Sequence, residues 1–88
     1  MLILSDNKVI NSENVLAFTI NKTSRFITEY EDTGYQIRAY HSGYTDEDNN
    51  SDYIIVKSYD LDEKDTAEAE LGMIAESMFL GQKVLDLR

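Results

Sequence analysis

Residues 45–52 (TDEDNNSD) are the densest cluster of potential oxygen ligands in the chain. Calcium-binding loops place carboxylate and amide oxygens at alternate positions, a glycine at the sixth position and a glutamate at the twelfth. Counted from Asp46, the sixth position is Ser51 and the twelfth is Lys57, so the pattern is incomplete. We therefore interpret the segment as a solvated connection between two strands, with a weak divalent-cation site as the alternative. The residues that would form this site are Asp46, Asp48, Asn50 and Asp52.

Catalytic chemistry finds little support in the residue types. His41 is the only histidine, and its neighbour Ser42 would point to the opposite face of a strand, so the two do not pair as base and nucleophile. The four glycines are scattered and form no phosphate-binding loop. Nothing in the spacing of the seventeen acids selects two of them for glycoside hydrolysis. We therefore expect neither an enzyme nor a bound cofactor.

Length and composition fit one small domain. A chain of 88 residues with 42% hydrophobic content can bury a single modest core, so residues 1–88 are expected to fold as one unit. The lack of cysteine excludes disulfides and thiolate chemistry and suits a reducing compartment. The apolar opening, MLIL, is too short for a signal peptide or a membrane span. The expectation is a cytoplasmic protein that does not enter a membrane.

The formal net charge of −9 is concentrated in one part of the chain. Residues 45–76 hold eleven acids and two lysines, and the acids and bases elsewhere cancel. Such a field repels nucleic acid and anionic membranes and attracts basic partners or cations. Solubility alone also accounts for it. The candidate acidic patch consists of Asp46, Glu47, Asp48, Asp62, Glu63, Asp65, Glu68 and Glu70.

Apolar runs with a period of two predict a sheet. The expected strands cover residues 1–4, 8–10, 15–20, 25–31, 35–41 and 53–59. Most of the connections are short and polar, which requires antiparallel neighbours, as in a meander. Alternation predicts that one face of this sheet is apolar. Its expected members are Leu16, Phe18, Ile20, Tyr35, Ile37, Ala39, Ile54 and Val56.

The hydrophobic period becomes helical after residue 60. Asp60 or Asp62 can cap the first amides, and Gly81 suits the left-handed residue after the last turn. Gly72 within the helix is expected to mark a close approach to the sheet. The tail, residues 84–88, alternates again and is either a last strand or a partner-facing arm. The apolar stripe of the helix comprises Ala67, Leu71, Ile74, Ala75, Met78 and Phe79.

These elements predict an α+β fold, with an antiparallel meander of about five to six strands and one C-terminal helix across one face. The opening MLIL with KVINSENV, the strand meander, and a closing helix containing LGMIAESM resemble small sheet-plus-helix proteins of low-GC Gram-positive bacteria and their phages. That resemblance spans most of the chain and implies this element order and a lack of catalysis. The chain is also similar in outline to pleckstrin-homology-like domains, which gives a partial barrel as the alternative fold.

One helix can cover only one face of a sheet, so some of the six tyrosines should face outward. Alternation opposite to Ile54 and Val56 selects the candidate partner-binding residues, which are Tyr40, Tyr53, Ile55 and Tyr59. The first hypothesis is a small interaction module that binds a protein partner or its own copy, as a homodimer, through this face. The second hypothesis is an acidic mimic of nucleic acid that occupies the basic cleft of a DNA-binding protein.

Overall fold

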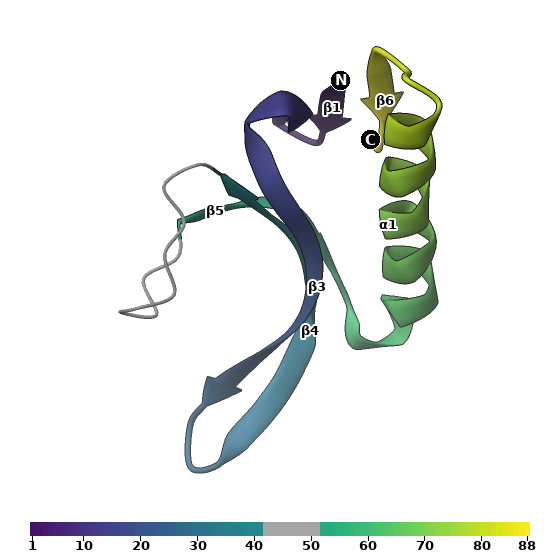
Figure 1. Ribbon diagram of the computed structural model, residues 1–88. Coiled ribbons are helices and arrows are strands. Elements are labelled where there is room, and N and C mark those ends of the chain that lie inside the picture. The colour runs from purple at the N-terminus through teal and green to yellow at the C-terminus, as the bar shows by residue number, and fades with distance from the viewer. Residues whose placement is uncertain (42–51) are drawn as a thin grey trace.

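The computed structural model describes residues 1–41 and 52–88, and they form an α+β fold (Figure 1). Asp46, Glu47, Asp48 and Asn50 lie outside the described residues. One helix, α1, runs beside the strands, and both chain termini lie together at one end of it (Figure 1). The strands are β1 (Leu2–Ser5), β2 (Lys8–Asn11), β3 (Val15–Phe26), β4 (Tyr30–His41), β5 (Tyr53–Tyr59) and β6 (Val84–Asp86), and the helix is α1 (Lys64–Phe79).

The six strands divide into two three-stranded sheets. The larger sheet has the order β3-β4-β5 and is an antiparallel meander, as expected. The smaller sheet has the order β2-β1-β6, in which β6 pairs parallel with β1. The α+β class and the helix packed on the sheet are therefore confirmed, and the tail is a strand. The described residues form no closed barrel.

The predicted strand boundaries between residues 20 and 35 are wrong. The polar segments 22–24 and 32–34 are paired within one long hairpin, and its turn is at residues 27–29. Cross-strand pairs replace the missing apolar contacts there, because Lys22 lies 3.4 Å from Asp32 and Arg25 lies 3.3 Å from Glu31. Polar residues therefore extend these strands instead of ending them, and the hairpin projects from the body (Figure 1).

The core lies between the larger sheet, the helix and the inner face of the smaller sheet. Its side chains are less than about a tenth exposed and include residues from all three layers. They are Ile3, Ile10, Ile37, Ala39, Val56, Tyr59, Ala67, Ile74, Leu85 and Leu87. Two hydrogen bonds also attach the smaller sheet to β5: Ser5 donates to the carbonyl oxygen of Val56, and Lys8 Nζ donates to that of Ile55 at 2.7 Å. These side chains occupy the outer edge of β5, which protects it from pairing with another chain.

A β-bulge in β5 reverses the expected orientation of Tyr59. Ile37 of β4 pairs with Lys57, whereas the next residue, Arg38, pairs with Ile55, so Val56 is an extra residue. An extra residue shifts the alternation of the strand by one position. Lys57 and Tyr59 consequently face the helix, and Tyr59 is 6% exposed. The prediction that Tyr59 faces outward is wrong for this reason.

Three further expectations about individual side chains are also wrong. A second irregularity, in β3 between Val15 and Ala17, leaves Leu16 65% exposed on the surface. The expected stripe of α1 is too wide, because Ala75, Met78 and Phe79 are exposed, Met78 to 45% and Phe79 to 89%. Gly72 does not approach the sheet, since a Cβ atom built there meets nothing within 4 Å.

Both ends of α1 are closed as the sequence indicated. Asp60 caps a short 3₁₀ turn, Leu61–Glu63, that leads into the helix. At the other end Gly81 has φ +69°, and the amides of Gly81 and Gln82 donate to the carbonyl oxygens of Met78 and Ser77 at 3.2 and 3.0 Å. Within residues 1–41 and 52–88, no helix is long and apolar enough to cross a membrane.

Gly34 is the glycine on which the close approach of β4 and β5 depends. A Cβ at this position would overlap the carbonyl oxygen of Tyr59, a backbone atom that cannot move independently. We expect Gly34→Ala to lower the free energy of unfolding by about 2 kcal/mol or more. Gly72→Ala is the matched control and should raise it by about 0.5–1 kcal/mol, because the new methyl group has open space within a helix. Urea unfolding measures both, and equal effects of the two changes would contradict the predicted contact.

Candidate interaction surface

Three of the four candidate partner-binding residues lie together on the larger sheet, on the face opposite α1. Tyr40 of β4 pairs directly with Tyr53 of β5, and Ile55 lies two residues along β5 from Tyr53 on the same face. Arg38 pairs with Ile55 and completes the group. We call these four residues, Arg38, Tyr40, Tyr53 and Ile55, the tyrosine face. No described helix or strand covers them.

Contacts among these side chains fix their positions. The rings of Tyr40 and Tyr53 are 5.5 Å apart between centroids and are inclined at 59°. The Arg38 guanidinium carbon lies 4.4 Å from the Tyr53 ring centroid, a cation–π arrangement. Its Nε donates to the side-chain oxygen of Gln36 at 3.1 Å. The sequence interpretation missed Arg38 as a member, although its strand position gives it the same orientation as Tyr40.

A hollow of about 310 Å³ adjoins the tyrosine face. It is lined by Leu16, Ala17, Thr19, Asn21 and Tyr40. Leu16 is exposed there because the irregularity in β3 turns it away from the core. The face therefore combines aromatic rings, one cation and a shallow apolar depression that a side chain of a partner can enter.

Tyr59 belongs to the core and has a different chemical environment. Its hydroxyl is buried close to the Glu70 carboxylate. Burial raises the pKa of this phenol well above its ordinary value, and the negative charge of nearby Glu70 raises it further. The Lys57 ammonium lies 5.6 Å from the centroid of the ring.

Glu70 was expected in the acidic patch, but it pairs with a lysine inside the fold. Lys57 Nζ, which the bulge turns toward α1, donates to Glu70 Oε1 at 2.8 Å and to Oε2 at 3.1 Å. The same ammonium donates to the carbonyl oxygen of Leu87 at 2.8 Å. The Glu70 side chain is only 13% exposed, so its charge is neutralised inside the fold. Asp62, Asp65 and Glu68 remain as exposed acids of the patch.

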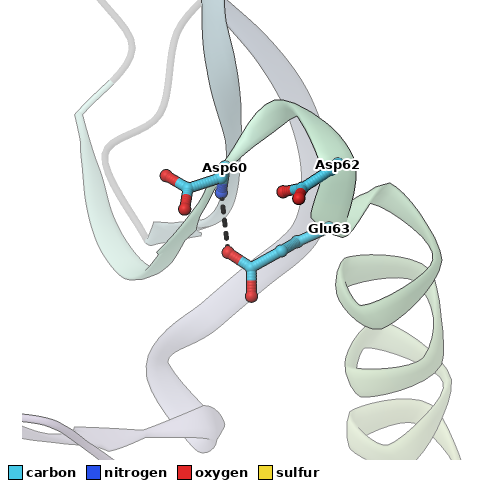
Figure 2. Close-up of side chains that lie close together, drawn as sticks. All are labelled: Asp60, Asp62 and Glu63. Carbon is cyan, nitrogen blue, oxygen red and sulfur yellow. Dashed lines mark hydrogen bonds between the residues drawn. The ribbon is translucent and has the colours of Figure 1, made fainter.

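Three carboxylates meet at the start of the helical region. Asp60, Asp62 and Glu63 place one oxygen each within 4.8 Å of one another (Figure 2). Glu63 Oε1, however, accepts a hydrogen bond from the backbone N–H of Asp60 at 2.9 Å, which is one half of a capping box (Figure 2). This bond explains the cluster as the closure of a helix end, so we assign no metal to it.

Comparisons of the chain with family models, curated proteins and solved structures find no match.

The Lys57–Glu70 ion pair joins the sheet to the helix, and its removal should be costly. We expect Glu70→Gln to lower the free energy of unfolding by about 2 kcal/mol, because it leaves a half-buried ammonium without its counter-charge. Glu68→Gln is the control: Glu68 is 3.9 Å from Lys64, both side chains are more than half exposed, and the change should stay within about 0.5 kcal/mol. Chemical unfolding at neutral pH measures both variants. Equal losses of unfolding free energy in Glu70→Gln and Glu68→Gln would show that the Lys57–Glu70 pair contributes no more than an exposed ion pair.

The buried phenol of Tyr59 predicts a loss of stability in alkali. Because its pKa is raised on folding, the unfolded chain releases this proton at lower pH than the folded chain does. Its contribution is complete below about pH 10, the pKa of an ordinary tyrosine, and is lost as pH rises above that value. Tyr59→Phe removes the titrating hydroxyl, so this variant should lose less stability than the parent as the pH rises above about 10.

Unfolding free energies measured between pH 8 and 11 test this expectation. Tyr30→Phe is the matched control, because Tyr30 is 79% exposed and should leave the alkaline slope unchanged. Identical slopes for the parent and Tyr59→Phe would contradict the assigned environment of Tyr59.

Proposed function

We propose that this protein is a non-catalytic, cytoplasmic interaction module that binds a protein partner, or its own copy as a homodimer, through the tyrosine face. The observation that supports this most directly is the grouping of two tyrosines, an isoleucine and an arginine on a sheet face that no described element covers. Tyr53 is 41% exposed, and an exposed aromatic side chain within such a group is typical of a surface that binds a partner.

The residue types of this face are those that contribute most to protein binding. Tyrosine and arginine are enriched among residues whose truncation greatly weakens complexes. The tilted ring pair and the Arg38–Tyr53 contact hold these side chains in place before binding, which lowers the entropy lost on association. Ile55 adds apolar area next to them. The face therefore favours a partner with a complementary apolar centre and a carboxylate that can reach Arg38.

Nucleic acid and anionic membranes are poor partners for this chain. Its net charge of −9 repels both of them. A protein surface, or a second copy that meets the first through the same face, does not depend on neutralising this charge. A two-fold homodimer would place each tyrosine face against the other.

Mimicry of nucleic acid is the second candidate, and the exposed acids of the helix start favour it. Asp62 lies close to Asp60 and Glu63, and Asp65 and Glu68 are exposed on the first turns of α1 that follow. A basic cleft of a DNA-binding protein could accept such carboxylates in place of phosphates. Binding of this kind decreases steeply with added salt, because it depends on charge alone.

Affinity capture by the tagged protein distinguishes the two candidates. The captured complexes are washed at low and at high salt, and mass spectrometry identifies what stays bound. For the tyrosine face we expect a salt-resistant partner, or the untagged chain itself, and loss of binding by at least about tenfold on Tyr53→Ser with Ile55→Ser. Val9→Ser is the control, because Val9 is 62% exposed on the smaller sheet. Each variant is used only if its thermal midpoint matches that of the parent.

The outcomes separate cleanly. One outcome would refute the tyrosine face and support mimicry. In it, high salt and the triple change Asp62→Asn with Asp65→Asn and Glu68→Gln each abolish binding of the partner, whereas the tyrosine-face variant still binds it. Sedimentation equilibrium of the parent and the tyrosine-face variant tests self-association. A monomer at all concentrations would exclude the homodimer.

A further inference from the structure

The outer surface of α1 exposes large apolar side chains that the core does not use. Phe79 is 89% exposed, Leu80 is 59% exposed and Met73 is 44% exposed. Phenylalanine is among the residues most often buried in folded proteins, so the high exposure of Phe79 is informative. The buried face of the same helix is formed by Ala67, Ile74 and Ser77, on its opposite side.

Small residues lie on this surface between the large ones. Ala69 and Gly72 are exposed, and a Cβ atom at Gly72 would meet nothing within 4 Å. Positions 69, 72, 73, 76 and 80 follow the spacing of one helix face. The surface therefore has a low centre at residues 69 and 72 and raised apolar side chains beside it, a shape into which the side chains of a second helix can pack.

Acids predominate on this surface. Asp65, Glu68 and Glu76 are exposed on α1, and Lys64 is the one basic residue of the helix, 3.9 Å from Glu68. Asp65 lies one turn before Ala69 and Glu76 one turn after Gly72 on the same helix face, so carboxylates stand at both ends of the low centre. A partner helix with an apolar segment that fits the low centre and basic residues on either side of that segment would match both properties.

We propose that the outer face of α1 binds a basic amphipathic helix of another protein. The apolar stripe of that helix would lie over Ala69 and Gly72, flanked by Met73 and, two turns further on, by Phe79, and its lysines or arginines would meet Asp65, Glu68 and Glu76. A second copy of this chain fits poorly, because two identical faces would oppose carboxylate to carboxylate. This site differs from the tyrosine face, which lies on the other side of the sheet from α1, so either can exist without the other.

A synthetic peptide tests the proposal with the full-length protein. The probe is a peptide of about 18 leucines and lysines, with the leucines at helical spacing so that they form one apolar stripe. One control peptide has the same composition in scrambled order. The other keeps the leucine positions and has glutamate in place of every lysine. Isothermal titration at about 0.15 M salt gives the affinity, and amide chemical shifts give the location. We expect the amphipathic probe to bind at least about tenfold more tightly than either control and to shift amides of residues 65–80.

Substitutions on the protein separate the apolar and charged contributions. Phe79→Ser and Glu68→Gln with Glu76→Gln should each weaken binding by about fivefold to tenfold. Gly72→Gln should weaken it to a similar extent by filling the low centre, although glutamine favours the helix and should raise the thermal midpoint. Tyr53→Ser with Ile55→Ser, on the tyrosine face, should leave the peptide affinity unchanged.

Equal binding of the amphipathic and scrambled peptides would overturn the proposal, because it would show attraction by charge alone. Shifts confined to residues outside α1 would overturn it too, as would unchanged affinity on both Phe79→Ser and Gly72→Gln.

Discussion

The extra residue at Val56 is the constraint that decides which side chains of β5 lie on each face of the larger sheet. It divides β5 into two parts whose odd-numbered side chains point in opposite directions. Before the bulge, Tyr53 and Ile55 face away from α1, and after it Lys57 and Tyr59 face toward α1. Without that shift, a lysine would face solvent and the Glu70 carboxylate would have no counter-charge next to the core.

Lys57 then connects the layers of the fold. Its ammonium contacts Glu70 of α1 and the carbonyl oxygen of Leu87, so one side chain joins the larger sheet, the helix and the C-terminal tail. A half-buried ion pair of this kind fixes geometry more than it adds stability. Within this tail, β6 pairs with β1 of the smaller sheet. With the layers joined in this way, the tyrosine face and the outer face of α1 are presented as two separate surfaces on opposite sides of one core.

The fold class could be predicted because hydrophobic period and turn residues are local signals. The helix ends at Asp60 and Gly81 were predictable for the same reason. The orientation of Tyr59 and the exposure of Leu16 were not, because each depends on a bulge, which is a property of two paired strands. The paired strands of the projecting hairpin were mistaken for turns, since polar cross-strand pairs resemble turn sequences. Tyr40, Tyr53 and Ile55 were grouped correctly, while Glu70 was misassigned because its partner is distant in sequence.

The orientation of β5 is the central claim, and tyrosine accessibility tests it most directly. Laser photo-CIDNP NMR polarises tyrosine rings whose hydroxyl groups a dissolved dye can reach. Polarisation is expected for Tyr53 and for the exposed reference Tyr30, and none for Tyr59, because these residues are 41%, 79% and 6% exposed. A polarised Tyr59 together with a silent Tyr53 would contradict the bulge, and with it the assignment of the tyrosine face.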